Sequence, residues 1–262
     1  GVCNTSQDYE IERQRGARLC PKGLSSTASL YDPDRVPTPL RRVGPRGSGQ
    51  WEAISWEEAI KEVAQNLKRI KDAHGPESLF WCTEDSSFIH VQQDFCELYG
   101  TPNFSMHSNI CDVARKVGFK LAMGHDRPLG DLQNSRYILL FGWNPLAATK
   151  WAHLPAIINR AREKGVKLVV VDPVFTQTAA KADEWVPLRP GTDGALALAM
   201  AHVIIKEGLY DKNFVSEWTV GFKEYKNLIK RYHPKWAQKV TSVPAETVRR
   251  IARELATTRP SV

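Results

Sequence analysis

Residues 167–193 constrain the fold of this chain more than any other segment. They begin with the run LVVV at 168–171, which is apolar and β-branched, as in a strand that a parallel sheet buries on both faces. Asp172 and Pro173 follow, and the proline cannot continue the strand because it has no backbone N–H. The chain must therefore turn at the carboxyl end of the strand, where open parallel sheets form ligand-binding crevices.

A second predicted strand, residues 137–141, ends in the same kind of polar turn. Gly142 permits close approach of the backbone to a ligand, and Asn144 offers both a hydrogen-bond donor and an acceptor. At the end of the other strand, the Asp172 carboxylate can accept from a ribose hydroxyl or a base N–H. Together the two strand ends predict one nucleotide-binding groove, whereas each alone is equally compatible with an ordinary strand-to-helix turn.

Strands alternate with helices along most of the chain, which predicts an α/β fold with doubly wound parallel sheets. A capping box at Ser55–Glu58 opens a helix that ends before Gly75. Further strands are expected near 78–82, 137–141, 166–171 and 185–188, and helices near 88–99, 110–123, 154–164, 177–181, 194–207 and 244–256. The domains expected are an irregular segment at 1–55, part of a first α/β domain at 56–132 and a second α/β domain at 133–262.

Charge and cysteine content narrow the class of protein. The net charge is +7, but Lys and Arg are scattered among acidic residues, so we expect an anionic cofactor and no nucleic acid. No apolar run reaches the roughly 20 residues that cross a bilayer. The five cysteines are odd in number and unevenly spaced, which favours metal ligation over a disulfide framework. Cys82, on a predicted buried strand, and Cys96, on a helix, are expected to act as small hydrophobic residues.

Two other cysteines have surroundings that suit metal ligation. Cys20 precedes Pro21 and Lys22, so a thiolate lies in a tight turn beside a cation, which suits an iron–sulfur cluster. Cys3 could be a second ligand to such a cluster. Cys111 follows a polar loop at the start of a predicted helix, where the helix dipole favours the thiolate form.

Seven motifs occur in an order and spacing that resemble the molybdopterin oxidoreductases of the dimethyl sulfoxide reductase type. They are LCPKG at 19–23, YDPDR at 31–35, WEAISW at 51–56, the loop 100–111, GWNP at 142–145, VDP at 171–173 with Thr176, and RPGTD at 189–193. The resemblance implies a molybdenum or tungsten ion held by two pterin guanine dinucleotides, and one [4Fe-4S] cluster near the amino terminus. It also implies a fragment of a larger multidomain protein.

The resemblance also implies roles for single residues. Cys3 and Cys20 correspond to cluster ligands, and Cys111 corresponds to the protein ligand of the metal. Lys22 lies between cluster and pterin, where a cation can assist electron transfer, and His107 could face the substrate or only satisfy backbone groups. Cys111, Lys22 and His107 are thus the predicted catalytic residues. The residues expected to bind the cofactor are Lys22, Gly142, Asn144, Asp172, Thr176, Gly191 and Asp193.

The chain departs from the family pattern at two places. The spacing from Cys3 to Cys20 is shorter than usual between the third and fourth cluster ligands, and two further cysteines would precede Cys3 in the family. Phe175 follows Pro173 and Val174 where the family often places an arginine, a change that affects phosphate contacts rather than the turn.

The function implied is an oxidoreductase of anaerobic respiration that transfers electrons between a small oxyanion or sulfur substrate and the cluster. Cysteine at 111 favours sulfur oxyanions, polysulfide, arsenate, nitrate or formate, with chains like thiosulfate or polysulfide reductase placed first. An iron–sulfur subunit is the expected electron-transfer partner, and any membrane contact is expected through partner subunits. The compartment is periplasmic or cytoplasmic in a prokaryote, with any export signal upstream of Gly1. Two alternatives stay open: a tungsten-dependent, non-redox hydratase, and a cofactor-free scaffold subunit.

Overall fold

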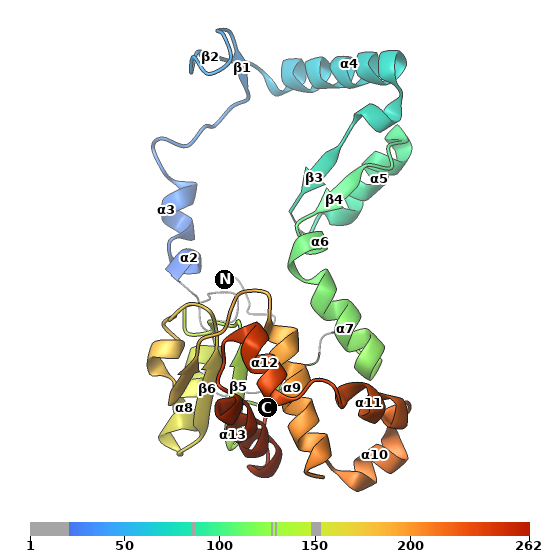
Figure 1. Cartoon of the computed structure of the whole chain (residues 1–262). Coiled ribbons are helices and arrows are strands. Elements are labelled where there is room, and N and C mark those ends of the chain that lie inside the picture. Colours follow the sequence, from blue (N-terminus) through green and yellow to red (C-terminus); the bar gives the residue numbers. More distant parts are fainter. Residues whose placement is uncertain (1–20, 85–86, 127, 129, 148–152) are drawn as a thin grey trace. The chain divides into compact units, whose positions relative to one another are not determined.

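The computed structural model describes residues 21–84, 87–126, 128, 130–147 and 153–262, which divide into two compact units (Figure 1). The first unit is formed by residues 27–129. The second is formed by residues 130–262 and the described residues that precede Thr27. By this division residues 27–55 lie in the same unit as residues 56–129. Cys3 and Cys20 lie outside the described residues.

The unit of residues 27–129 contains a hairpin, a parallel strand pair and several helices. Strands β1 and β2 pair antiparallel, and β3 pairs in parallel with β4. The predicted capping box is confirmed, because Ser55 accepts from the backbone of Glu58 while the Glu58 carboxylate accepts from Ser55. Its elements in chain order are α3 (Ser26–Leu30), β1 (Leu40–Arg42), β2 (Trp51–Ala53), α4 (Trp56–His74), η1 (Pro76–Ser78), β3 (Trp81–Thr83), α5 (Ile89–Tyr99), β4 (Phe104–Met106), α6 (Ser108–Cys111) and α7 (Val113–Met123).

Several predictions in this unit were wrong in detail. The hairpin and strand β4 were not predicted, because strands of three residues are too short to show a periodic pattern. The helix expected at 110–123 is interrupted at Asp112, a residue type that prefers helix ends to helix interiors. Cys82 lies on β3 but is exposed rather than buried, since this strand pair is only partly covered. Cys96 is buried as expected, and burial raises the pKa of its thiol.

The unit of residues 130–262 is built on a parallel sheet with the strand order β5-β6-β7. Tyr137 lies beside Lys167 and Phe141 beside Val171, so the carboxyl ends of β5 and β6 coincide. Its elements, after α2 (Pro21–Leu24), are β5 (Tyr137–Phe141), α8 (Leu154–Glu163), β6 (Lys167–Val171), η3 (Ala179–Lys181), β7 (Glu184–Val186), α9 (Asp193–Lys206), α10 (Lys212–Trp218), α11 (Phe222–Ile229), α12 (Pro234–Thr241) and α13 (Ala245–Thr257).

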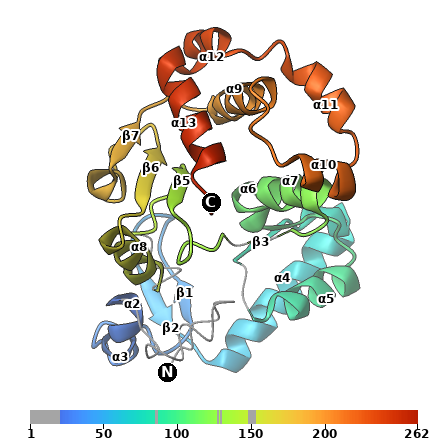
Figure 2. The ribbon, with the colours of Figure 1, turned by 90° about the horizontal axis from the view of Figure 1, so that it is seen from below.

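Helices cover both faces of this sheet, with α8 on one side and α9 and α13 on the other (Figure 2). Strand β6 divides its side chains between the two cores: Val169 and Val171 face α9, α12 and α13, while Leu168 and Val170 face α8. All four are fully buried. A strand in this position must be apolar at every residue, which explains the uninterrupted run in the sequence and confirms the doubly wound α/β prediction.

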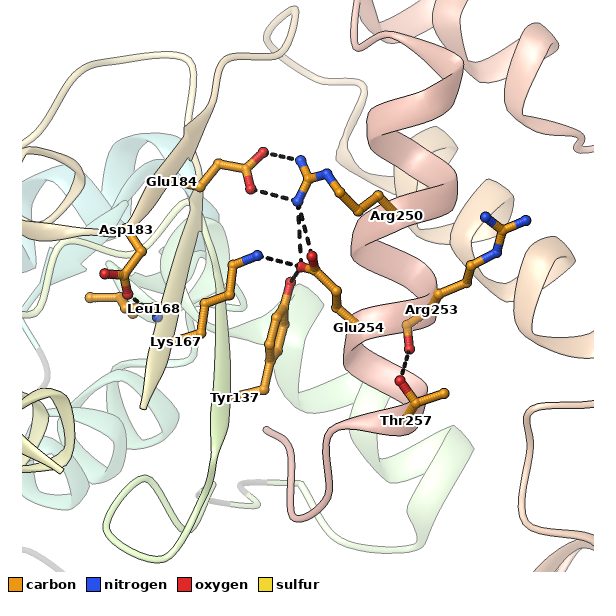
Figure 3. Close-up of polar contacts among 9 residues, drawn as sticks. All are labelled: Tyr137, Lys167, Leu168, Asp183, Glu184, Arg250, Arg253, Glu254 and Thr257. Atoms are coloured by element: carbon orange, nitrogen blue, oxygen red, sulfur yellow. Dashed lines mark hydrogen bonds and ion pairs between the residues drawn. The ribbon is translucent and has the colours of Figure 1, made fainter. Parts of the chain in front are cut away.

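An ion-pair network attaches α13 to the amino ends of the three strands (Figure 3). Glu254 accepts from Lys167 Nζ at 2.7 Å and from the Tyr137 hydroxyl at 3.2 Å. Arg250 on the same helix donates two hydrogen bonds to Glu184, at 2.8 and 2.5 Å. Burial and the Glu254 carboxylate both raise the pKa of Tyr137, so the phenol stays protonated and donates. The network lies at the sheet edge opposite the predicted nucleotide groove.

The outer edge of β5 is paired as well. Val262 donates to the Tyr137 carbonyl at 3.0 Å, and Leu139 donates to the Val262 carbonyl at 2.7 Å, in a parallel bridge. Among the residues that the structure describes, no helix combines the length and the apolar character needed to span a membrane.

Candidate cofactor site

Gly142 begins the turn after β5. Its φ of 54° lies in the left-handed region, where a side chain would be strained, and its backbone N–H donates to the Val171 carbonyl at 2.8 Å. A Cβ atom placed on Gly142 would meet nothing within 4 Å. The glycine is therefore required by the backbone conformation, and the open space beside it permits close approach of a ligand.

Asn144 ties the turn after β5 to the turn after β6. Its Oδ1 accepts from both the backbone N–H and the hydroxyl of Thr178, at 3.1 and 2.7 Å, while its Nδ2 donates to Gln177 at 3.0 Å. The Thr178 hydroxyl also accepts from the backbone N–H of Leu146 at 3.1 Å. Thr178 is fully buried, so its bonds with Asn144 and Leu146 are shielded from water, whereas the bond to Gln177 is exposed. Asn144 thus brings the two predicted strand ends into one site.

Asp172 presents an acceptor at the end of β6. The residue is only 7% exposed, and one carboxylate oxygen accepts from the Val174 N–H at 2.8 Å, while its backbone carbonyl accepts from Trp185 Nε1 at 2.8 Å. The second carboxylate oxygen has no hydrogen-bond partner within the described part of the chain. A largely buried carboxylate with a spare oxygen suits a ligand that offers N–H or O–H groups.

Thr176, Gly191 and Asp193 complete the predicted nucleotide-binding set. The Thr176 hydroxyl accepts from the Ala179 N–H at 3.1 Å and so supports the start of η3. Gly191 has a φ of 77° and open space where a Cβ would stand. Asp193 is the first residue of α9, where its negative charge already complements the helix dipole. The Asp193 carboxylate therefore suits N–H or hydroxyl groups of a ligand better than a phosphate.

The predicted metal ligand lies in the other unit. Cys111 is the last residue of α6, so the prediction that it lies at the start of a helix was wrong; its thiol is exposed and free. His107 follows β4, and its Nδ1 lies 3.7 Å from an oxygen of Glu84, which follows β3. The neighbouring Asp112 pairs with Arg115 at 2.8 Å, and this hydrogen bond is the main cause that lowers the pKa of its carboxyl. Cys111 and His107 thus follow the carboxyl end of the parallel pair β3–β4, as the nucleotide-binding residues do in their own sheet.

A metal ion at Cys111 would need ligands from elsewhere. The residues with described positions contain no group of three or more His, Cys, Asp or Glu side chains that could hold a metal. A single thiolate leaves most of a coordination sphere to a cofactor, which agrees with a metal bound by the sulfur atoms of a pterin. Lys22 lies on α2 and is exposed.

Sequence reasoning missed two residues that shape the nucleotide-binding turns. The Thr178 hydroxyl donates a hydrogen bond to Asn144 Oδ1, and Trp185 Nε1 donates one to the Asp172 carbonyl. Their positions carried a weak signal, since Thr178 follows Thr176 by two residues and Trp185 is an aromatic residue in a short strand. Only the pairing of turns far apart in the sequence gives these side chains their partners.

Comparison with known proteins agrees with this geometry. The pattern of the family described as molybdopterin oxidoreductase matches residues 35–243. Thiosulfate reductase molybdopterin-containing subunit PhsA of Salmonella typhimurium is 38% identical over 247 residues, which are 94% of this chain and 32% of that protein. Dimethyl sulfoxide reductase DmsA of Haemophilus influenzae is 32% identical, over 98% of this chain and 36% of its own length. The solved structure of acetylene hydratase from Pelobacter acetylenicus has a TM-score of 0.78 and 34% identity, with 93% of this chain and 34% of that chain covered.

The chain belongs to the molybdopterin oxidoreductase family, because the family pattern matches more than half of it. Membership of this family supports a molybdenum and molybdopterin cofactor, and tungsten is compatible with the likeness to acetylene hydratase. The chain spans about a third of the length of the relatives it matches. PhsA is itself named as a subunit.

Proposed function

We propose that the protein reduces a small sulfur-containing oxyanion at a molybdenum centre held by two pterin guanine dinucleotides. Thiosulfate is the first candidate substrate. Cys3 and Cys20 would be among the ligands of a [4Fe-4S] cluster, which would supply one-electron transfer between the metal centre and an iron–sulfur partner subunit. The compartment proposed is the periplasm or the cytoplasm of a prokaryote.

The 38% identity to a thiosulfate reductase subunit, which extends over 94% of this chain, is the observation that carries the proposal. Its span includes both turns of the nucleotide-binding site and the free thiol of Cys111. A thiolate is a soft ligand and suits a metal that is already bound by sulfur.

Each part of the chain has a distinct task in this proposal. When bound, the cofactor supplies two-electron redox chemistry at its metal. Asp172 and Asp193 accept hydrogen bonds from the nucleotide, Gly142 and Gly191 admit its close approach, and Asn144 with Thr176 holds the turns in place. Cys111 ligates the metal, and His107 faces the substrate.

Lys22 connects the two redox groups in the proposal. It follows Cys20 by two residues, and its exposed ammonium is free to lie against a ligand rather than a buried carboxylate. A cation between cluster and pterin favours electron density there and so assists transfer between the two groups.

Metal analysis of the whole protein, purified without oxygen, tests the proposal. We expect about one molybdenum and about four irons per chain, as one molybdenum centre and one cubane cluster require. With a reduced viologen dye as donor, thiosulfate should be converted to sulfide and sulfite with consumption of two electrons. If the protein contains molybdenum but does not reduce thiosulfate, thiosulfate is not its substrate. If it contains iron but neither molybdenum nor tungsten, it has no pterin-bound metal centre, and the role of a scaffold subunit is favoured.

A tungsten-dependent hydratase is the second candidate, because the structure matches that of acetylene hydratase with a TM-score of 0.78. Hydration of a triple bond involves no net electron transfer, so this activity would need no electron-transfer partner. Tungsten in the purified protein, together with acetaldehyde formation from acetylene and no dye oxidation with thiosulfate, would establish this alternative in place of the reductase.

A further inference from the structure

Two large apolar side chains are exposed at the turn after β6. Val174 is 62% and Phe175 60% exposed, directly after the buried strand and beside the buried carboxylate of Asp172. The Asp172 carboxylate closes this turn, because it accepts from the Val174 N–H at 2.8 Å. One turn thus carries both an exposed aromatic ring and a carboxylate with a spare oxygen, two groups that can contact the same planar ligand.

The Phe175 ring is held in place rather than free. It packs against Trp185 with ring centroids 5.0 Å apart at an interplanar angle of 63°, an edge-to-face arrangement. Trp185 is itself fixed, because it packs against the core on the α8 side and donates its Nε1–H to the Asp172 carbonyl at 2.8 Å. One indole therefore orients both the ring of Phe175 and the turn that carries Asp172.

Ring and carboxylate together select a particular ligand chemistry. A fixed aromatic face binds a flat heteroaromatic ring by stacking, and a carboxylate accepts from N–H groups on the edge of such a ring. A guanine base has both features, since its N1–H and its exocyclic amino group lie on one edge. Adenine presents an acceptor nitrogen at the corresponding position, which a carboxylate disfavours.

We propose that Phe175, supported by Trp185, is the stacking surface for the guanine base of the nucleotide whose N–H groups Asp172 accepts. This inference rests on the proposed function, because it takes the guanine dinucleotide as the ligand. It adds to the site an aromatic residue that binds the face of the base, while Asp172 accounts for the preference for guanine.

Titration of the cofactor-free whole protein with GMP tests this role. The probe variants are Phe175→Ala and Phe175→Leu, which remove the flat ring, and Phe175→Tyr, which keeps it. Val174→Ala is the matched control, since Val174 is equally exposed in the same turn. We expect Ala and Leu to weaken GMP binding by about 5- to 100-fold, as loss of one stacked base contact implies. For Phe175→Tyr and the Val174→Ala control, the Kd for GMP should stay within about twofold of the wild-type value. AMP should bind the wild type more weakly than GMP.

The leucine variant separates stacking from simple packing. If Phe175→Leu binds GMP like the wild type, or if Phe175→Tyr binds as weakly as Phe175→Ala, the stacking role is overturned. Absence of GMP binding by the wild type overturns it as well. The proposed function is tested by the molybdenum content and the thiosulfate turnover of the wild-type protein with its cofactor bound. The stacking role of Phe175 and the proposed function can therefore fail independently of each other. If Phe175→Ala does not fold, the comparison of Phe175→Leu with Phe175→Tyr still tests whether the ring stacks on the base.

Discussion

Cys111 and Cys82 form a natural experimental pair, since both are exposed free thiols in the same unit. Only Cys111 is proposed as a metal ligand. Replacement by alanine removes the thiolate while it leaves the residues around Cys20 intact. We expect Cys111→Ala to reduce turnover by at least about 1000-fold, as loss of an essential group does, while iron content per chain is unchanged.

Cys82→Ala is the control, and it should keep both turnover and metal content. Steady-state assays with a reduced dye, together with metal analysis of both variants, give the answer. If the Cys111→Ala variant keeps its turnover, Cys111 is not the protein ligand of the metal. Equal loss in both variants would mean that the unit depends on its thiols for folding rather than for chemistry.

Asn144 permits a test of how the two turns are joined. Alanine removes three hydrogen bonds to residues 177 and 178, so we expect the free energy of unfolding to fall by about 1–3 kcal/mol. Asn144→Asp keeps the oxygen that accepts from Thr178 and should be less destabilised. Gln177→Ala removes only the exposed bond and should change stability by less than about 0.5 kcal/mol. Chemical denaturation measures all three.

The order of these effects identifies what Asn144 does. If Asn144→Ala is fully stable but fails to retain the cofactor, the amide contacts the nucleotide directly instead of positioning the turns. If Gln177→Ala is as destabilised as Asn144→Ala, the exposed bond rather than the buried pair joins the turns.

The position of helix α13 depends on its contacts with the strands, because the helix carries the side chains that pair with the amino ends of β5, β6 and β7. Burial alone would raise the pKa of Glu254, but its bonds to Lys167 and Arg250 outweigh burial and hold this pKa below 4.5. We expect Glu254→Gln to lower the free energy of unfolding by about 1–2 kcal/mol at neutral pH, since the carboxylate is only partly screened by water.

The pKa shift of Glu254 fixes the direction of the pH dependence. A carboxyl whose pKa is lower in the folded state contributes stability above its unfolded pKa, and this contribution is lost as the pH falls through the folded value. The difference between wild type and Glu254→Gln should therefore shrink as the pH falls below 4.5 in thermal melts. Glu246→Gln, on the exposed side of α13 in a pair with Arg249, should show little effect at any pH. A constant difference down to acidic pH would contradict the ion-pair account.

Each of the two units carries its own parallel strands, and in each the described site residues other than Lys22 follow the carboxyl ends of these strands. A ligand that binds only the folded protein stabilises it in proportion to its occupancy. We therefore expect removal of the cofactor to lower the melting temperature of the whole protein by several degrees, as a change of a few kcal/mol implies. Differential scanning calorimetry of loaded and cofactor-free protein measures this. Equal melting temperatures at full occupancy would show that the nucleotide-binding turns are stable without their ligand.

Local patterns were sufficient for the elements whose signal is continuous along the chain. The run at 168–171 predicts a strand buried on both faces, and the Ser55–Glu58 box predicts the start of α4; the structure has both. Strands of three residues and the break at Asp112 were not predicted, because short elements carry too few side chains for a period to appear. The exposure of Cys82 depended on what covers β3, which no local pattern contains.

The amino-acid sequence by itself determined the doubly wound α/β class and the identity of the strand ends, because apolar periodicity, proline and glycine act within a few residues. The family was determined by the resemblance of seven motifs, in order and spacing, between residues 19 and 193. Tertiary structure alone decided the partners of these strand ends. It joined Asn144 to Thr178 across 34 residues. It placed Trp185 in contact with both the Asp172 carbonyl and the Phe175 ring, and Glu254 in contact with the first residues of β5 and β6. These contacts exist only when parallel strands lie in register, since the register brings distant turns to the same edge of a sheet.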